Sequence, residues 1–389
     1  MMEGWKNTRL GELVQLVYGK PLAPEDRDPN GLYPAYGANG EKTRTNKFYC
    51  DSHSIIIGRK GSAGEITLTE EKFWPLDVTY FIEFDRTQND FRFIYYLLST
   101  LNLPSLAKGV KPGINREEVY ALPVSVPALN EQRRIVAILD EAFEAIATAK
   151  ANTEKNRLNA EELGLAMEEA CLARCAAREG KPKQLADLCE LIVDCEHKTA
   201  PTQETGYPSI RTPNIGRGEL ILNGVNRVSE ETYKAWTRRA IPQAGDLILA
   251  REAPAGNVAV IPPGLQVCLG QRTVLIRPKA SIFKSRYLAH LLLQRASQER
   301  LLAHSRGATV QHVNMKDIRA FQISRIPSLT VQRQVLEELG SLHRQSSALM
   351  QVQLGKLTAL DELKKSLLHQ AFTGQLTAWA ADRQLAAVG

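Results

Sequence analysis

The sequence predicts a mixed α/β fold of the α+β class. Two repeated globular domains are separated by two long helices that form an antiparallel coiled coil with pseudo-twofold symmetry. Three observations predict this fold. The two halves of the chain repeat one another, each half contains a long stretch without proline, and short apolar runs are bounded by glycine, proline and asparagine. At 389 residues the chain is long enough for two or three domains with cores of their own.

The internal repeat consists of short matched segments. They occur in the same order in both halves, and the offset between matched residues rises smoothly from 175 to 200. Three pairs of matched segments are Leu10–Leu16 with Leu185–Leu191, Ile55–Arg59 with Leu247–Arg251, and Phe93–Leu98 with Tyr287–Leu292. Because collinear matches indicate one structural unit used twice, we expect two copies of the same domain.

The repeat and the proline-free stretches together set the expected domain boundaries. We expect globular domains at 1–127 and 181–327, long helices at 128–180 and 328–376, and a tail at 377–389. Short apolar runs are typical of buried strands, and one helical stretch lies near the end of each globular domain. The expected strands are Ser54–Gly58, Val78–Phe84, Asp246–Ala250 and Thr273–Arg277, and the expected helices are Phe91–Thr100 and Lys284–Arg300. The glycine-rich segment 36–40 predicts a turn.

The long helices begin after Pro127 and Pro327, where the candidate N-caps are Asn130 and either Ser328 or Thr330. Apolar or small residues of the first helix alternate in steps of four and three, which is the pattern of a coiled-coil seam. They are Ile135, Leu139, Ala142, Ile146, Ala149 and Thr153. In the second helix a less regular stripe contains Leu342, Leu349, Leu357, Leu360, Leu363 and Leu367.

Three glycines lie inside the expected long helices, namely Gly164, Gly340 and Gly355. Each destabilises a helix interior by about 1 kcal/mol, so bends or frayed stretches are expected. The alternative to a coiled coil is that each amphipathic helix packs on its own globular domain.

Basic side chains are concentrated in one region. Residues 181–328 carry 21 basic and 12 acidic side chains, a balance of +9, whereas residues 1–127 carry 15 and 16. A basic block is expected to attract a polyanion, and a solvated basic surface is the alternative. No apolar run approaches the roughly 18 residues of a membrane span, no signal peptide is evident, and the six cysteines are scattered. We therefore expect a cytoplasmic protein without membrane contact.

The sequence contains no pattern for catalysis or for a metal. A phosphate-binding Gly-Lys-Ser/Thr loop, a GxGxxG loop and an Asn-Pro-Pro-aromatic methylation motif are all absent. Nuclease-like combinations of Asp51 with 70–72 and of Asp361 with 362–364 fall in a turn and on a helix face. We expect no catalytic residue, no metal site and no cofactor bound by this chain. The competing hypotheses are a self-contained nuclease or methylase with an atypical site, and a structural coiled-coil scaffold that binds only proteins.

Several longer motifs resemble the specificity (S) subunit of type I restriction-modification systems, over about residues 5–376. The motifs are Gly109–Asn115, Leu122–Pro127 and Asn130–Ile135 in the first half, and Ile210–Gly216, Gly245–Gly256, Leu269–Arg272 and His369–Leu376 in the second. The resemblance implies two target-recognition domains, each recognising one part of a split double-stranded DNA sequence, and helices that set the gap between the parts. It also implies a non-catalytic subunit that docks two modification subunits, which use S-adenosylmethionine to methylate adenine, and through them restriction subunits.

Candidate DNA contacts are cations, which suit phosphates, and Arg, Asn, Gln, Thr or His, which can reach base edges or phosphates from loops. In the first domain they are Lys42, Arg44, Arg59, Lys60, Lys108, Lys111 and Asn115. In the second they are Arg211, Asn214, Arg217, Arg251, Arg272, Arg306, Thr309, Gln311, His312 and Asn314. For Arg59–Lys60 and Arg251 a salt bridge within the domain is the alternative. The resemblance adds Glu131, Gln132, Gln332 and Phe372 as candidate partner contacts.

Overall fold

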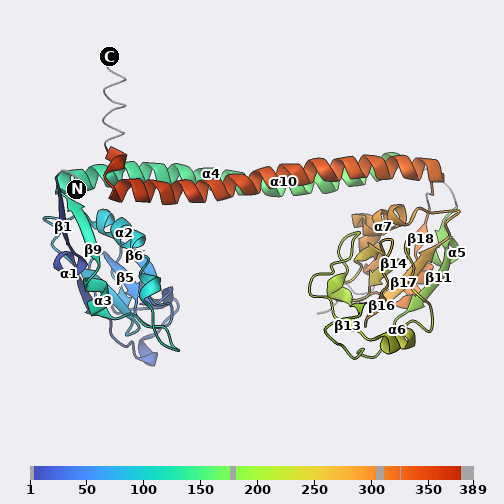
Figure 1. Cartoon of the computed structure of the whole chain (residues 1–389), viewed down its shortest axis with the longest axis horizontal. Coiled ribbons are helices and arrows are strands. Elements are labelled where there is room, and N and C mark those ends of the chain that lie inside the picture. Colours follow the sequence, from blue (N-terminus) through green and yellow to red (C-terminus); the bar gives the residue numbers. More distant parts are fainter. Residues whose placement is uncertain (1–3, 176–180, 304–310, 325, 378–389) are drawn as a thin grey trace, which may run out of the picture. The chain divides into compact units, whose positions relative to one another are not determined.

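The computed structural model describes residues 4–175, 181–303, 311–324 and 326–377. The chain divides into two compact units: unit 1 comprises residues 1–155 and 353–389, and unit 2 comprises residues 156–352. Two long helices, α4 (Leu129–Cys175) and α10 (Leu329–Phe372), each contribute residues to both units. Figure 1 shows the elements of each unit, coloured along the chain.

Unit 1 contains two sheets and a two-stranded ribbon. The larger sheet is antiparallel with strand order β2-β8-β5-β6, and the smaller has order β4-β3-β7, in which β3 and β7 are parallel. The strands are β1 (Trp5–Arg9), β2 (Gln15–Tyr18), β3 (Tyr33–Gly37), β4 (Gly40–Thr45), β5 (Ser54–Gly58), β6 (Ile66–Thr69), β7 (Trp74–Pro75), β8 (Thr79–Glu83) and β9 (Pro123–Pro127), and β1 pairs with β9. The helices are α1 (Leu10–Leu13), α2 (Phe91–Thr100) and α3 (Arg116–Tyr120), with 3-10 turns η1 (Pro24–Asp26) and η2 (Leu103–Leu106).

Unit 2 repeats this topology. Its antiparallel sheet has order β11-β17-β14-β15, its smaller sheet has order β13-β12-β16 with β12 parallel to β16, and β10 pairs with β18. The strands are β10 (Lys183–Gln184), β11 (Cys189–Asp194), β12 (Tyr207–Ile210), β13 (Arg227–Val228), β14 (Leu247–Ala250), β15 (Val258–Val260), β16 (Cys268–Leu269), β17 (Thr273–Pro278) and β18 (Gln322–Ile323). The helices are α5 (Leu185–Leu188), α6 (Glu230–Trp236), α7 (Ser285–Leu293), α8 (Arg295–Leu301) and α9 (Met315–Ala320), with a 3-10 turn η3 (Thr212–Asn214). The predicted repeat of one domain is thus confirmed.

One of the two central strands of each larger sheet is buried along its whole length. Ile56 of β5 faces Phe81 of β8, and Ile248 of β14 faces Leu275 of β17. Every residue of β5 and of β14 is buried, which fits apolar runs without alternation. The strand predicted at Ser54–Gly58 and the helix predicted at Phe91–Thr100 have those bounds in the structure.

The core of each unit includes the ends of both long helices. In unit 1, Ile135 and Leu139 of α4 share the core with Ala371 of α10, each at most 1% exposed. In unit 2, Val335 of α10 shares the core with Leu172 of α4. Each globular core is therefore completed by the first turns of the helix that follows it and by the last turns of the other helix.

The two long helices are antiparallel within each unit, as predicted. In unit 1, Lys150 forms an ion pair with Asp361, and Nη2 of Arg134 donates to the backbone oxygen of Thr377 at 3.5 Å. In unit 2, Arg174 forms an ion pair with Glu338. These pairings join earlier residues of α4 to later residues of α10, which is the order expected of antiparallel helices.

The seam predicted for α4 is confirmed, whereas the stripe predicted for α10 is partly wrong. Ile135, Leu139, Ile146 and Thr153 are buried, and Ala142 and Ala149 between them are partly buried. In α10, Leu349 and Leu363 are 44% and 47% exposed. Alternate steps of four and three from buried Val335 pass through buried Leu339 and exposed Leu349 to buried Gln353, so the stripe has the spacing of a seam but is not buried at every member.

The glycines do not interrupt the long helices. α4 is one helix of 47 residues through Gly164, and α10 is one helix of 44 residues through Gly340 and Gly355. The predicted frayed stretches are therefore absent at these positions. At Gly164 an added Cβ would lie 2.8 Å from Oγ of Ser346, so the missing side chain lets the two helices approach closely.

Two further details of the sequence prediction need correction. The helix expected at Lys284–Arg300 is two helices, because Gln294 has an extended backbone with φ −56° and ψ 143°. Asn130 lies inside α4, so it is not the cap, whereas Oγ of Ser328 accepts from the backbone N–H of Val331 at 3.4 Å.

Candidate nucleic-acid interface

The structure joins two of the predicted loops in unit 1. We call 59–61 the β5 loop, because it follows β5, and 108–113 the tip loop. The backbone N–H of Ile114 donates to the oxygen of Arg59 at 3.1 Å, and that of Gly61 donates to the oxygen of Pro112 at 2.8 Å. Lys60 and Gly113 form a bridge between the loops. Segments about fifty residues apart in the sequence therefore form one surface.

The same connection occurs in unit 2. The backbone N–H of Val313 donates to the oxygen of Arg251 at 2.9 Å, and Glu252 forms a bridge with His312. Arg251 follows β14 as Arg59 follows β5. The structure therefore brings together, in both units, loops that the sequence suggested separately.

The two matched arginines are held inside their units. Nε and Nη2 of Arg59 donate to the backbone oxygen of Asp77 at 3.2 and 2.7 Å, and its guanidinium lies 5.3 Å from the ring centroid of Tyr18. Nη1 of Arg251 lies 3.0 Å from a carboxylate oxygen of Asp194, and its side chain is 20% exposed. The internal salt bridge raised as the alternative is present for Arg251, which supports its loop.

The polar segment containing Lys42 and Arg44 is strand β4, paired with β3 in a hairpin. Nε and Nη2 of Arg44 donate to the backbone oxygens of Gly31 and Leu32, both at 2.8 Å, so this arginine braces the hairpin. The predicted turn at 36–40 is the two-residue connection of this hairpin.

The hairpin connection lies beside the β5 loop. An added Cβ on Gly58 would meet the oxygen of Ala38 at 2.5 Å, so only glycine permits this approach. Lys42 is exposed on β4.

In the tip loop and the helix after it, polar groups also have local roles. Nζ of Lys108 forms an ion pair with Glu118 at 2.6 Å, although the lysine side chain is 73% exposed. Oδ1 of Asn115 accepts from the backbone N–H of Glu117 at 2.9 Å and caps α3. Asn115 is therefore a structural cap first, and its amide nitrogen stays available to a ligand.

In unit 2, Asn314 holds the N-cap position of α9 but does not cap it through its side chain, which contacts other side chains instead. Nε2 of His312 lies 2.9 Å from Oδ1 of Asn314, whose Nδ2 donates to Asp317 at 3.3 Å. Gln311 is exposed. Arg306 and Thr309 lie outside the described residues.

The remaining candidates of unit 2 follow strands β12 and β16. Arg272 has φ +63° and forms an ion pair with Glu252 at 2.6 Å, and its backbone oxygen accepts from the N–H of Arg251 at 2.8 Å. The side chain of Arg211 lies against Gly270, where an added Cβ would meet its Cγ at 2.5 Å. Arg211, Glu252 and Arg272 thus belong to the surface formed by the β14 end.

Asn214 and Arg217 are used locally. Oδ1 of Asn214 accepts from the N–H of Arg211 at 3.1 Å, and its Nδ2 donates to the oxygen of Ile221 at 3.1 Å. Nη2 of Arg217 donates to the backbone oxygen of Leu293 at 2.9 Å, which ties its loop to α7. The side chains of these two residues therefore form hydrogen bonds within unit 2 that hold the loops next to the candidate surface.

Three of the lysines predicted to contact DNA in unit 1 are exposed and make no ion pair with a described residue. Among the residues that the structure describes, Lys42, Lys60 and Lys111 are exposed and no carboxylate lies within ion-pair distance of their ammonium groups. Phosphate groups are the natural ligands of such ammonium groups. The near-neutral unit 1 therefore has a local cationic surface despite its balance of charge.

The candidate partner residues have mixed placements. Gln132 and Gln332 are 1% and 0% exposed, which corrects the expectation that these side chains contact a partner. Phe372 packs on the unit 1 core, with its ring centroid 5.2 Å from that of Phe93. Glu131 has a 31% exposed side chain 4.0 Å from Arg134, and partner contact through Glu131 stays a prediction.

The two glutamines make equivalent hydrogen bonds. Oε1 of Gln132 accepts from the N–H of Asp90 at 2.8 Å and its Nε2 donates to the oxygen of Pro127 at 3.0 Å. Oε1 of Gln332 accepts from the N–H of Lys284 at 2.8 Å and its Nε2 donates to the oxygen of Pro327 at 2.9 Å. Each glutamine fastens the start of a long helix to the start of α2 or α7. The repeat of Gln-Arg in the sequence was a signal for this shared structural role.

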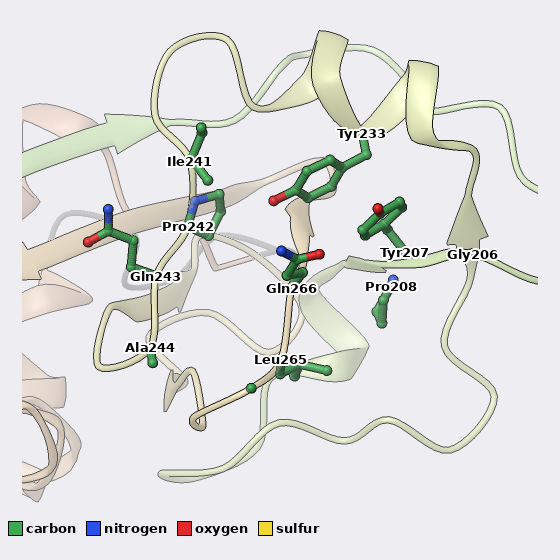
Figure 2. Close-up of a pocket in the computed structure, with 11 residues that line it drawn as sticks. Gly206, Tyr207, Pro208, Tyr233, Ile241, Pro242, Gln243, Ala244, Leu265 and Gln266 are labelled. Carbon is green, nitrogen blue, oxygen red and sulfur yellow. The ribbon is translucent and has the colours of Figure 1, made fainter.

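Sequence reasoning missed a pocket of about 790 Å³ in unit 2 (Figure 2). Its lining includes Tyr207 and Tyr233, whose rings stack at 4.3 Å between centroids, and Gln243 and Gln266. The residues that line it have no formal charge. The pocket lies before β14 and β16, whereas the candidate loops follow these strands, so it is separate from the candidate interface.

Two buried titratable groups lie near the candidate surface. Burial raises the pKa of Tyr80, beside Tyr18 and Arg59, to about 12. Burial also raises the pKa of the Cys195 thiol, next to Asp194. Both groups stay protonated and neutral at physiological pH, so they act as parts of the core. No helix in the described part of the chain has the length and apolar character of a membrane span.

Comparisons with known proteins agree with this architecture. A family model described as the type I restriction modification DNA specificity domain matches residues 2–160 and 178–359. The type I restriction enzyme MjaVIII specificity subunit of Methanocaldococcus jannaschii is 22% identical over 407 residues, which cover 96% of this chain and 93% of that protein. The EcoDI specificity subunit of Escherichia coli is 20% identical over 406 residues, covering 97% and 90%.

Solved structures share the fold. A chain of a type I R-M system, solved to explain complex assembly and conformational transition, has a TM-score of 0.71 at 19% identity, covering 96% of this chain and 99% of that one. The HsdS subunit of Thermoanaerobacter tengcongensis has a TM-score of 0.55 at 19% identity, covering 97% and 98%.

Proposed function

Because the chain belongs to the type I restriction modification DNA specificity family, we propose that it recognises a bipartite sequence in double-stranded DNA, one part by each unit. The chain itself performs no chemistry in this proposal. It selects the site at which its partners act.

One observation supports this proposal above the others. Both units present a surface in which a strand-end loop and the loop before a short helix are joined by equivalent hydrogen bonds, Ile114 to Arg59 and Val313 to Arg251. A pair of equivalent loop surfaces on a repeated scaffold suits a target with two parts. Loops held by a rigid scaffold are where binding residues are most often found, and side-chain donors and acceptors on them can read base edges.

The roles of the candidate residues divide by chemistry. Lys42, Lys60 and Lys111 bind phosphates and position unit 1 without discriminating between sequences. Arg211 and Gln311 of unit 2 have the donors that recognise purine edges, and each good bidentate contact contributes about 1–3 kcal/mol of discrimination. Arg251 and Asn115 hold the loops in the conformation that presents these side chains.

Two modification subunits bind the long helices in this proposal, and restriction subunits join through them. S-adenosylmethionine belongs to the modification subunits, which methylate adenine. The support is a set of apolar side chains on the two long helices that are 40–56% exposed. Its members are Leu158, Leu163, Leu165 and Met167 of α4, and Leu349, Val352, Leu354 and Leu363 of α10.

A footprint tests the recognition proposal. The full chain, assembled with its modification subunits, is incubated with a random-sequence duplex pool, and bound duplexes are sequenced and footprinted. We expect two protected patches with fixed sequences, separated by a gap of fixed length and indifferent sequence. Protection without sequence preference would support the scaffold hypothesis instead.

A second arm tests the absence of chemistry. The purified chain alone is incubated with the selected duplex and either Mg²⁺ or S-adenosylmethionine. We expect neither cleavage nor methylation. Methyl transfer or strand cleavage by the chain alone would overturn the non-catalytic part of the proposal and support the enzyme hypothesis.

A further inference from the structure

One apolar side chain of unit 1 is presented fully to solvent. Val110 is 108% exposed, more than any other large hydrophobic residue that the structure describes. It lies in the tip loop, between Gly109 and Lys111. An isolated exposed apolar residue is ordinary on a surface, but this one stands within the loop that the candidate DNA contacts share.

The tip loop is held at its base in a defined position. The backbone N–H of Lys108 donates to the oxygen of Gly113 at 2.9 Å, and the N–H of Gly113 donates back to Lys108 at 3.1 Å. The hydrogen bond from Gly61 to Pro112 at 2.8 Å fastens the loop to the β5 loop. Val110 is therefore presented by a braced turn.

The surroundings of Val110 suit a nucleic acid. Lys111 is adjacent to it in sequence, and Lys60 is on the β5 loop that the tip loop contacts. Gly61 and Gly109 both have positive φ, +84° and +93°, and no side chain of their own. Bare backbone at these two positions lets a ligand approach the loop closely.

We infer that Val110 contacts the 5-methyl group of a thymine in the major groove and makes unit 1 specific for an A·T pair at that position. This inference rests on the proposed DNA recognition. Thymine presents the one apolar group of the major groove, and small apolar side chains recognise it. Side chains that wedge between base steps are the longer Phe, Leu, Ile and Met or the rigid Pro, and the short β-branched valine suits a methyl contact better.

The test pairs a protein variant with a DNA variant. The duplex is the one selected by the assembled complex, and each thymine of the unit 1 part is replaced in turn by deoxyuracil, which lacks only the methyl group. With the natural chain, one replacement is expected to weaken binding about fourfold, the effect of removing one buried methyl group. With Val110→Ser, the same replacement is expected to have no effect.

Controls separate this contact from other causes. Leu32→Ser removes another exposed apolar side chain of unit 1, 70% exposed, and should leave every deoxyuracil effect unchanged. Equal deoxyuracil effects in Val110→Ser and the natural chain would overturn the inference, as would a unit 1 part without an A·T pair. Weaker binding by Val110→Ser without this coupling would instead support a wedge. If no bipartite protection is seen, the proposed function itself fails.

Discussion

Two buried glutamines show how single residues are reused by the repeat. Gln132 and Gln332 satisfy backbone groups at the start of α2 and α7 and at Pro127 and Pro327. A buried backbone group without a partner costs about 1–3 kcal/mol, so these side chains are hard to replace.

We predict that Gln132→Met lowers the free energy of unfolding of unit 1 by about 2 kcal/mol, because it leaves the N–H of Asp90 and the oxygen of Pro127 unpaired. Hydrogen exchange of the β5 amides measures the change. Glu131→Gln, at the half-exposed neighbouring position, should change the free energy by less than about 0.5 kcal/mol. Equal effects of the two substitutions would contradict the structural role of the glutamine.

The exposed lysines of unit 1 predict a salt effect. Lys60→Gln and Lys111→Gln should each weaken binding to all sequences alike. Each should also reduce the slope of log affinity against log salt concentration by about 0.9, since one phosphate contact is lost. Lys6→Gln, on β1, should leave the slope unchanged. Titration of the selected duplex at several salt concentrations measures this, and a change of sequence preference would count against a phosphate role.

A histidine contact of unit 2 predicts a pH effect. Burial alone would raise the pKa of Glu168, but the hydrogen bond from Nδ1 of His290 at 2.5 Å and nearby positive charges lower it below its ordinary value of 4.5. The folded state therefore gains stability that is complete above about pH 4.5 and is lost as the pH falls through the lowered pKa. Denaturant unfolding between pH 3 and 6 should show this loss in the natural chain and in Glu162→Gln, but a smaller loss in Glu168→Gln.

At the scale of elements, the long helices depend on how close they approach. Gly164 faces Ser346, whose Oγ also donates to the oxygen of Ala160 at 3.3 Å. Gly355 faces open space, with no heavy atom within 4 Å of an added Cβ. The same substitution should therefore have different effects at the two sites.

We predict that Gly355→Ala stabilises its helix by up to about 1 kcal/mol, the usual gain in a helix interior. Gly164→Ala should stabilise the protein less than Gly355→Ala, or destabilise it, because the added Cβ would displace the Ser346 side chain from its hydrogen bond. Thermal unfolding of both variants measures the difference. Ser346→Ala combined with Gly164→Ala should recover part of the gain, and identical effects at both glycines would contradict the close approach.

Elements were predictable from sequence where a local pattern decides them. β5 is an apolar run buried along its length, and α2 begins at Phe91, directly after Asp90, whose side chain caps it. The break at Gln294 was not predictable, because Gln298 of α8 fixes it by donating across it to the oxygens of Leu292 and Gly256. The burial of Leu349 and Leu363 was predicted wrongly, because leucine favours a helix in exposed positions as well as in buried ones.

At the scale of the whole molecule, the helices are the elements shared by both units. We predict that seven residues inserted between 155 and 156, with seven more between 352 and 353, lengthen the gap of the DNA target by about 3 base pairs. Seven helical residues span about 10.5 Å, and the insertion keeps the seam in phase. Both insertions fall at the boundary between the units and leave each one whole.

Footprinting of this variant should show the same two protected sequences at a longer separation. Insertion into α4 alone is the control, since it shifts the seam of one helix against the other and should weaken binding at every gap length. An unchanged gap with altered protected sequences would contradict a spacing role for the helices.

The candidate interface was predictable as a set of loops but not as an arrangement. The repeat aligned Arg59 with Arg251, and the structure gives both the same place after a strand. Which cations are held internally depends on distant groups, such as Asp77 for Arg59 and Asp194 for Arg251, and no local pattern identifies these partners.

The shared cores have a consequence for synthesis on the ribosome. Unit 2 is a continuous stretch that is complete once residue 352 has emerged, whereas the core of unit 1 includes Ala371 and Leu376. The residues of unit 1 that precede unit 2 in the sequence must therefore wait for Ala371 and Leu376 before their core can close. During translation, unit 2 would complete its core before unit 1. A ribosome that stalls before residue 371 would leave unit 1 without a complete core and exposed to proteases.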